Sequence, residues 1–185
     1  MLKLLIIIIL SVNFVSASMV EKSFTYDDVK RSYLEFIPSN HNIKAPINLV
    51  IGLHGYSGSA SGFEKETTGM FNKSAEKYEF IAIYPQGEYF YNDANKDYSF
   101  ISSWNAFPNK KPNKEFCSLD AVIYPKYPNC ENSNRCSWTS CSDDLGFVKK
   151  IIDISKENYL IDKVFVIGMS NGGMMAQALA CKYPN

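Results

Sequence analysis

The sequence predicts an α/β fold, in which a mostly parallel sheet carries helices on both of its faces. The first observation is that three short runs are almost entirely apolar, over residues 47–53, 80–84 and 164–167. Strands that are buried on both faces of a parallel sheet have this composition. The second observation is that segments with apolar residues at helical spacing alternate with these runs. Strand and helix therefore follow one another as they do in a parallel sheet with helical crossovers.

Residues 1–17 have the layout of a secretory signal peptide. Lys3 gives a short positive start, and residues 4–10 form an unbroken apolar run. Val15 and Ala17 are the small residues that a signal peptidase needs. The apolar run is too short for a comfortable transmembrane helix, which takes about 20 residues. We therefore expect cleavage after Ala17 and a secreted, extracellular protein, with an uncleaved anchor as the alternative.

The other elements can be placed in chain order. Residues 23–37 alternate loosely between polar and apolar, which predicts an opening pair of strands. Helices are expected over three ranges, residues 63–78, 143–158 and 171–183. Asp143 and Asp144 lie in the first turn of the second of these helices, where the helix dipole favours negative charge.

Residues 88–142 break the alternation and are predicted to form a cysteine-rich insertion. A structureless stretch of this length is unusual in a compact domain, and disulfides would make it tolerable. Four of the five cysteines lie in it, namely Cys117, Cys130, Cys136 and Cys141. The spacing of these cysteines also permits a zinc site, but no histidine lies nearby and an exported protein favours disulfides. Four cysteines allow three pairings, among which the sequence does not choose. Cys181, on the third expected helix, is predicted to be a buried thiol or half of a bridge whose partner is not in this chain.

The composition excludes several classes of protein. Of the 185 residues, 46% are apolar, and 19 Lys and Arg balance 19 Asp and Glu. A disordered chain would carry fewer apolar residues, and a nucleic-acid binder would normally carry a basic excess. We therefore expect one ordered domain over residues 18–185 that binds no nucleic acid and, once the leader is cleaved, no membrane. No phosphate loop or zinc signature occurs, so neither a cofactor nor a metal is expected.

The chemistry is predicted at the end of the third apolar run. Residues 168–172 read Gly-Met-Ser-Asn-Gly, which matches the G-x-S-x-G pattern of a nucleophile elbow between a strand and a helix. Such a turn is sharp and strained and raises the serine hydroxyl above the sheet. Gly168 and Gly172 are needed because side chains there would collide. Ser170 is therefore the candidate nucleophile, and a glycine-rich turn without chemistry is the alternative.

A serine nucleophile of this kind needs an oxyanion hole, which is a pair of N–H groups that binds the developing negative charge. One donor is expected to be the main-chain N–H of Asn171. The other is expected in the loop after the first apolar run, where His54 and Gly55 precede Tyr56. We predict that the Tyr56 N–H donates and that His54 braces the loop.

The base that would activate Ser170 has no candidate in the sequence. In this type of site an acidic residue and then a histidine follow the nucleophile along the chain. Residues 171–185 contain no Asp, Glu or His, and the two histidines, His41 and His54, lie upstream. Two members of the expected catalytic triad are therefore not in this chain.

Four segments of the chain resemble one known family. They are residues 53–87, SWNA at 103–106, residues 143–166 and residues 164–185. These segments are similar to the secreted polyhydroxybutyrate depolymerase and feruloyl esterase family of α/β-hydrolases. The resemblance extends over residues 30–185. It implies an α/β-hydrolase fold whose C-terminal strands are missing from this chain.

The resemblance also implies a function. The implied function is that of a carboxylic ester hydrolase in which Ser170 is the nucleophile, and Tyr56 and Asn171 supply the oxyanion donors. Trp104 would lie near the cleft and contact the substrate. The substrate would be an ester linked to a polysaccharide, or a polyester. Because nothing here matches the family's acidic residue and histidine, the chain alone is expected to be inactive.

Two alternatives to an esterase stay open. A naturally short pseudoenzyme would bind an ester or a polysaccharide through the aromatic residues of the 88–142 insertion. A lipase or serine peptidase of the same fold is the other alternative, although a lipase would be expected to carry a more apolar lid. Asn72 begins a glycosylation sequon, and its place on an expected helix leaves its occupancy open.

Overall fold

The computed structural model describes residues 18–39, 41–42, 44–91, 100–106, 135–136, 139–140 and 142–184. The predicted signal peptide and most of the predicted insertion lie outside these ranges. So do three of the cysteines proposed to form disulfides, namely Cys117, Cys130 and Cys141.

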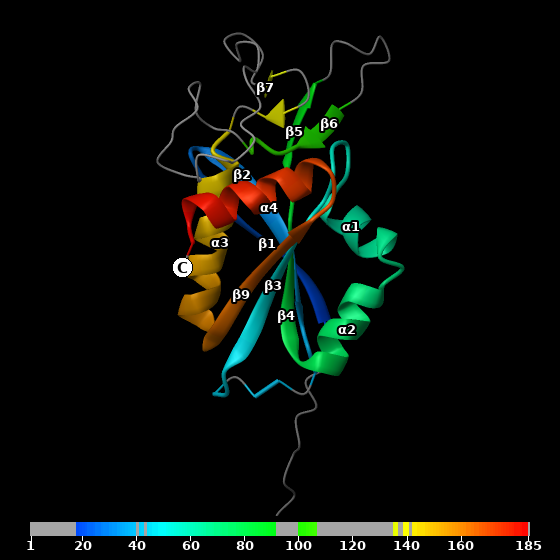
Figure 1. Cartoon of the computed structure of the whole chain (residues 1–185), viewed down its shortest axis with the longest axis vertical. Helices are drawn as coiled ribbons and strands as arrows, with labels where there is room; N and C mark the ends of the chain where they lie inside the picture. Colours follow the sequence, from blue (N-terminus) through cyan, green and yellow to red (C-terminus); the bar gives the residue numbers. More distant parts are fainter. Residues whose placement is uncertain are drawn as a thin grey trace, which may run out of the picture.

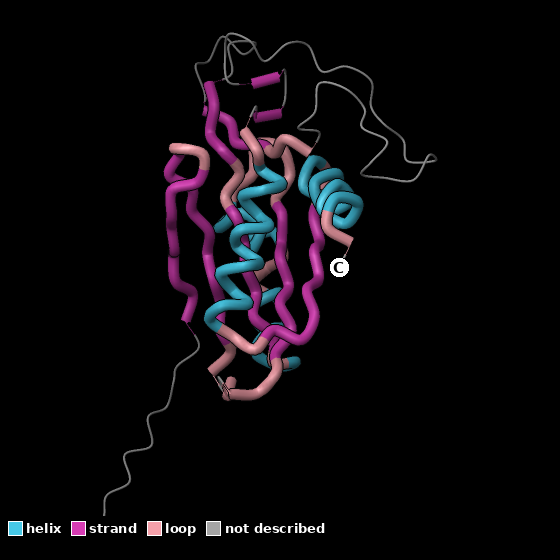
Figure 2. Tube along the Cα trace, turned by 90° about the vertical axis from the view of Figure 1, so that its left-hand side faces the viewer, coloured by secondary structure: helices cyan, strands magenta, loops and turns pink. Residues whose placement is uncertain are grey.

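The molecule is built around one five-stranded sheet, whose strands run side by side along its long axis (Figures 1 and 2). In their order across the sheet they are β1 (Ser18–Tyr26), β2 (Val29–Ile37), β4 (Phe80–Pro85), β3 (Ile47–Leu53) and β9 (Ile161–Gly168). β3 pairs in parallel with both β4 and β9, whereas β2 runs antiparallel to both β1 and β4. Only β2 is therefore reversed, which confirms the mostly parallel sheet.

Helices cover both faces of the sheet, as predicted (Figure 1). The helices α1 (Ala60–Glu66) and α2 (Met70–Tyr78) pack on one face, and α3 (Asp144–Asn158) and α4 (Asn171–Lys182) on the other. Successive residues of β4 point to opposite faces of the sheet. Ile83 packs into the core under α3 and α4, and Tyr84 packs into the core under α1 and α2.

The single helix expected over residues 63–78 is wrong, because the structure has two helices there. Thr68 and Gly69 have φ angles of 54° and 66°, which lie in the left-handed region. A right-handed helix cannot continue through that region, so α1 ends before these residues and α2 begins after them. Ser59 caps α1 by accepting a hydrogen bond from the Gly62 N–H at 2.9 Å.

The strand at residues 164–167 exists as part of β9, but the expectation that both of its faces are buried is wrong. Val164 and Val166 pack against the core under α3 and α4. Phe165 and Ile167, on the opposite face, are 48% and 41% exposed. Within the described residues, β9 pairs only with β3 and forms an edge of the sheet. β9 therefore carries apolar side chains that the described part of the chain leaves exposed.

The predicted insertion contributes short strands to the described structure. The strands β5 (Glu88–Tyr91) and β6 (Phe100–Ser103) form an antiparallel pair, and β7 (Arg135–Cys136) pairs with β8 (Thr139–Ser140). β6 and the residues after it enter the core, since Ile101 and Trp104 are both buried. The end of β6 is therefore part of the main body of the molecule.

Cys181 on α4 is disulfide-bonded. Its partner lies among the residues whose side chains the structure does not describe. Because the partner belongs to this chain, the expectation of a buried thiol or of a partner outside the chain is wrong. The helices within the described ranges are all too short or too polar to span a membrane.

Candidate active site

Ser170 lies at the sharp turn between β9 and α4. Its φ and ψ angles are 51° and −119°, a region that residues other than glycine rarely adopt. Hydrogen bonds of the main chain hold the turn, from the Met169 N–H to Leu53 O at 3.1 Å and from the Gly172 N–H to Met169 O at 2.8 Å. The serine is exposed at the point where the strand ends. A strained main chain that presents an exposed hydroxyl is the geometry that the G-x-S-x-G pattern predicts.

The two glycines of the pattern lie where no side chain fits. A Cβ atom on Gly168 would lie 2.2 Å from the carbonyl oxygen of Gly172. A Cβ atom on Gly172 would lie 2.2 Å from Leu53 O and 2.4 Å from His54 O. All three neighbours are main-chain atoms, which cannot rotate away. The crowding expected from the sequence is therefore present, and it comes from the end of β3 as well as from the turn itself.

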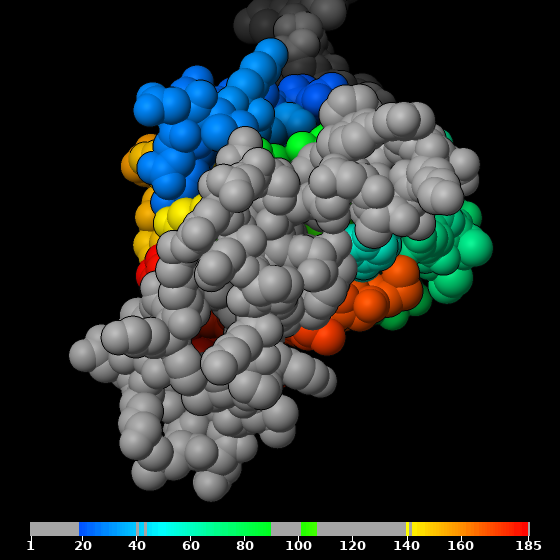
Figure 3. Space-filling model, turned by 90° about the horizontal axis from the view of Figure 1, so that it is seen from above, coloured from blue at the N-terminus to red at the C-terminus, as the bar shows by residue number. Residues whose placement is uncertain are grey.

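The loop after β3 runs directly beside Ser170. A Cβ atom on Gly55 would lie 3.5 Å from Ser170 Cβ and 3.4 Å from Met169 O, which is ordinary van der Waals contact. Tyr56, the next residue, is exposed. Seen from above in Figure 3, the orange surface of the end of β9 and the start of α4 lies next to the teal surface of the segment after β3. The structure thus brings Ser170 and the segment that carries Tyr56 together.

Asn171 begins α4, so its main-chain N–H belongs to the helix turn whose N–H groups have no partner inside the helix. This places it at the positive end of the helix dipole, immediately after Ser170. Its use as an oxyanion donor together with the Tyr56 N–H stays a prediction.

His54 is completely buried and both of its ring nitrogens form hydrogen bonds. Nδ1 donates to Gly55 O at 2.7 Å, and Nε2 accepts from the Gly87 N–H at 3.0 Å. This pattern requires the neutral ring with its proton on Nδ1. Burial lowers the pKa of His54 below its ordinary value. His54 therefore braces the loop, as predicted, and is not placed to act as a base for Ser170.

Trp104 follows β6 and lies under the site. It is 0% exposed, its indole N–H donates to His54 O at 2.8 Å, and its ring lies 4.8 Å from the His54 ring between centroids. Its contact with substrate stays a prediction, and the contacts that the structure gives it are with the protein.

The side chain of Asn171 is a feature that the sequence did not reveal. Its Oδ1 accepts hydrogen bonds from Ser103 Oγ at 2.9 Å and from the Trp104 N–H at 2.8 Å. Its Nδ2 donates to Trp104 O at 3.2 Å. The resemblance singled out the SWNA segment, but nothing in the sequence linked that segment to the residue after the nucleophile.

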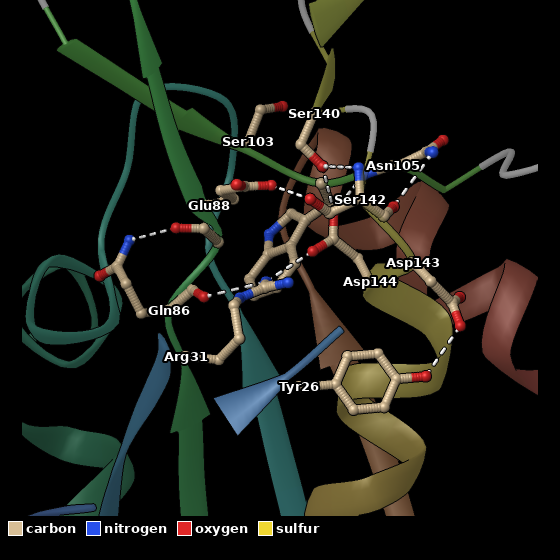
Figure 4. A network of polar contacts seen from close by, with 12 residues as sticks. Tyr26, Arg31, Gln86, Glu88, Ser103, Asn105, Ser140, Ser142, Asp143 and Asp144 are labelled. Atoms are coloured by element: carbon tan, nitrogen blue, oxygen red, sulfur yellow. Dashed lines mark hydrogen bonds and ion pairs between the residues drawn. The ribbon is translucent and has the colours of Figure 1, made fainter. Parts of the chain in front are cut away.

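A buried ion pair anchors the same segment from its other end (Figure 4). Arg31 Nη2 lies 2.5 Å from Asp144 Oδ1, and both side chains are at most 2% exposed. The other oxygen of Asp144 accepts hydrogen bonds from the Asn105 N–H at 2.6 Å and from Ser140 Oγ at 2.5 Å. Asp144 is in the first turn of α3, as expected, but its carboxylate also holds the chain just after Trp104.

The neighbouring Asp143 caps α3. One carboxylate oxygen accepts from the Gly146 N–H at 3.0 Å, and the other accepts from the Tyr26 hydroxyl at 2.8 Å. Burial, followed by the hydrogen bond to Asp143, raises the pKa of Tyr26. Both aspartates are therefore engaged in structure, and neither contacts Ser170.

The described part of the chain supplies no base for Ser170. Within it, the Ser170 hydroxyl forms no hydrogen bond to a carboxylate or an imidazole. No group of three or more His, Cys, Asp or Glu side chains in the described ranges could hold a metal ion. The geometry is that of a serine at an elbow beside a candidate oxyanion loop.

Two curated proteins are similar in sequence. Poly(3-hydroxyalkanoate) depolymerase C of Paucimonas lemoignei is 33% identical over 73 residues, which cover 35% of this chain and 18% of that protein. A probable acetylxylan esterase A of Aspergillus fumigatus is 27% identical over 153 residues, which cover 82% of this chain and 31% of that protein. Each match therefore covers less than a third of the length of the relative. No family model matches the chain.

Solved structures establish the fold. An S-formylglutathione hydrolase from Agrobacterium tumefaciens superposes with a TM-score of 0.56 and 13% identity, over 94% of this chain and 56% of that one. A ferulic acid esterase superposes with a TM-score of 0.53 and 12% identity, over 92% and 55%. The chain has the α/β-hydrolase fold, as the sequence predicted.

Proposed function

We propose that this chain carries the nucleophile of a secreted, serine-dependent carboxylic ester hydrolase. The observation that supports this most is the conformation of Ser170, whose φ of 51° occurs at an exposed strand-to-helix turn. Such a conformation costs about 1–3 kcal/mol and persists mainly where function requires it. The loop with Tyr56, which runs beside the serine, supports the same assignment because acyl transfer needs donors on both sides of the oxyanion.

In the proposed reaction, Ser170 Oγ attacks the carbonyl carbon of an ester. The carbonyl oxygen becomes an oxyanion, which accepts hydrogen bonds from the main-chain N–H groups of Tyr56 and Asn171. When this intermediate collapses, the alcohol leaves with a proton and an acyl-serine remains. Water then attacks the acyl-serine, which releases the acid and restores the Ser170 hydroxyl.

The proton of Ser170 needs a base, and we propose that the base lies in a part of the protein beyond residue 185. In this fold the base is a histidine oriented by an acidic residue, and both follow the nucleophile. Two observations support the existence of such a part. The relatives are more than three times as long as their matched regions, and β9 leaves Phe165 and Ile167 uncovered within the described residues. We accordingly propose that residues 1–185 alone are inactive.

The proposed location and substrate have separate support. Export is supported by the signal-like residues 1–17 and by the disulfide at Cys181, since disulfides persist in oxidising compartments. The proposed substrate is an ester of a plant polysaccharide or a polyester. It is supported by the names of the two relatives, which refer to acetylxylan and to a poly(3-hydroxyalkanoate).

The test compares two proteins, residues 18–185 and the product of the reading frame carried to its natural stop codon. Hydrolysis of p-nitrophenyl acetate, methyl ferulate, acetylxylan and poly(3-hydroxybutyrate) is measured for each, with Ser170→Ala as the control. We expect Ser170-dependent turnover in the extended product only. Removal of a triad base costs on the order of 10⁴–10⁶ in turnover, so the shorter protein should fall to the level of its Ser170→Ala variant.

Two results would contradict the proposal. An extended product that hydrolyses none of these esters would exclude the proposed esterase. Hydrolysis by residues 18–185 that Ser170→Ala abolishes would show that the missing base is not needed.

A further inference from the structure

The end of β6 connects the two segments that carry the proposed oxyanion donors. We propose that Trp104 is a positioning residue that acts through its indole N–H, and that the side chain of Asn171 holds it in place. Together they fix the loop at residues 54–58 against the turn at Ser170. The inference rests on the proposed function, because it takes Tyr56 and Asn171 as the donors.

The first link joins Asn171 to the end of β6. Its amide group forms three hydrogen bonds, which reach Ser103 Oγ and the main-chain N–H and carbonyl of Trp104 at 2.8–3.2 Å. Asn171 is 2% exposed, so water does not compete for these bonds. The main chain of Asn171 follows Ser170 directly. Its side chain therefore ties the position of the nucleophile turn to the segment at Trp104.

The second link joins Trp104 to the loop after β3. The indole N–H donates to His54 O at 2.8 Å, and the ring packs on the His54 imidazole, which in turn donates to Gly55 O. A hydrogen bond from the Ser57 N–H to Ser102 O, at 2.8 Å, holds the loop from its other side. The loop is thus attached before Tyr56 to Trp104, which follows β6, and after Tyr56 to Ser102 in β6.

The consequence of the two links is a fixed separation between two donors from different parts of the chain. An oxyanion donor works when it lies about 2.7–3.1 Å from the place where the charge develops, and a misplaced donor loses most of its effect. Trp104 is fully buried, so it supports the site from below. A buried support changes the turnover rate, whereas a residue that contacts substrate changes substrate affinity as well.

The first experiment follows the hydrogen bond itself and needs no activity. The indole N–H signals are recorded by NMR on ¹⁵N-tryptophan-labelled protein, and Trp138→Phe identifies the Trp104 signal because the chain has two tryptophans. Asn171→Ala should shift that signal and accelerate its exchange with solvent, although the Asn171 side chain does not touch the indole N–H. A Trp104 signal with unchanged shift and exchange in Asn171→Ala overturns the proposal.

The second experiment follows the loop by hydrogen exchange and mass spectrometry. Trp104→Phe keeps an aromatic ring and removes the indole N–H, so exchange in residues 54–58 should become about three- to tenfold faster, as loss of one hydrogen bond predicts. The matched control is Tyr84→Phe, which removes a partly buried hydrogen bond to Asn72 on the side of the sheet under α1 and α2. It should leave the loop unchanged. Equal exchange in Trp104→Phe and the wild type overturns the proposal.

The third experiment uses the extended reading-frame product and separates positioning from substrate contact. Trp104→Phe should lower kcat by about tenfold and leave KM within about twofold, because one donor is misplaced while the binding surface is intact. A raised KM at unchanged kcat overturns the proposal and favours direct contact. If the wild type shows no Ser170-dependent turnover, the proposed function fails, and the two exchange experiments still decide whether Trp104 and Asn171 hold the loop.

Discussion

Arg31 and Asp144 form an ion pair that is completely enclosed by the fold, although 113 positions separate them in the sequence. The guanidinium also lies over the Phe147 ring, 4.0 Å from its centroid. One oxygen of the carboxylate binds Arg31, and the other binds the chain at Asn105. The pair therefore joins β2, α3 and the segment after β6 in one buried network (Figure 4).

Asp144→Asn should lower the free energy of unfolding by about 3–5 kcal/mol, because it leaves the Arg31 charge buried without a counter-charge. Urea denaturation of residues 18–185 measures this change. The control is Asp153→Asn, which breaks the partly exposed pair with Lys149 and should cost about 0.5 kcal/mol or less. Equal losses in the free energy of unfolding of the two variants would show that the Arg31–Asp144 pair contributes no more to stability than the Lys149–Asp153 pair.

Ser170→Gly should stabilise the protein while it removes the nucleophile. Glycine adopts a φ of 51° without the steric cost that serine bears, but it also gives the unfolded chain more conformational freedom. The net change that we expect is an increase of about 1 kcal/mol in the free energy of unfolding. Ser170→Ala retains the strain and should show no comparable gain. Urea denaturation of both variants gives the comparison, and a loss of stability in Ser170→Gly would contradict the assigned strain.

Gly172→Ala should destabilise the turn by about 2–3 kcal/mol, because the new methyl group meets the carbonyl oxygens of Leu53 and His54. The matched substitution is Gly55→Ala, whose methyl group has room and whose φ is not positive. It should change the free energy of unfolding by less than about 1 kcal/mol. Thermal or urea unfolding of the two variants measures the contrast, and equal stabilities would contradict the packing described for the turn.

Stability should fall as the pH drops below about 6.5, the ordinary pKa of histidine. Burial lowers the pKa of His54 in the folded protein, so the unfolded chain binds more protons between that lowered pKa and 6.5. Protonation would also remove the acceptor for the Gly87 N–H. The pKa of His41 is lowered by burial as well, so the measurement is made in His41→Asn. A free energy of unfolding that is constant between pH 7 and pH 5 in that variant would contradict the buried neutral state of His54.

The sequence was sufficient for the parts of the fold that depend on local pattern. The apolar runs located β3 and β4 within a residue or two, because strands with both faces covered contain few polar residues. The G-x-S-x-G pattern located the strained turn at Ser170, because only glycine fits at two of its positions. The break between α1 and α2 was not predicted, because nothing about a threonine at position 68 indicates that it adopts a positive φ.

The contacts that depend on tertiary structure could not be predicted. No periodicity joins Arg31 to Asp144, and each residue alone suggests an exposed charge. The Asn171 amide could have faced solvent from the start of a helix, and only the fold brings Ser103 and Trp104 against it. Burial of the Trp104 indole on His54 likewise depends on how β6 enters the core.

The chemical identity of the reactive residue decides whether Ser170 is the nucleophile. The extended reading-frame product is treated with a p-nitrophenyl phosphonate ester, and the modified peptide is identified by mass spectrometry. We expect one phosphonyl group on Ser170, and no modification of the Ser170→Ala variant. Modification at a different residue in an enzymatically active product, or ester hydrolysis that persists at the wild-type rate in Ser170→Ala, would contradict this assignment.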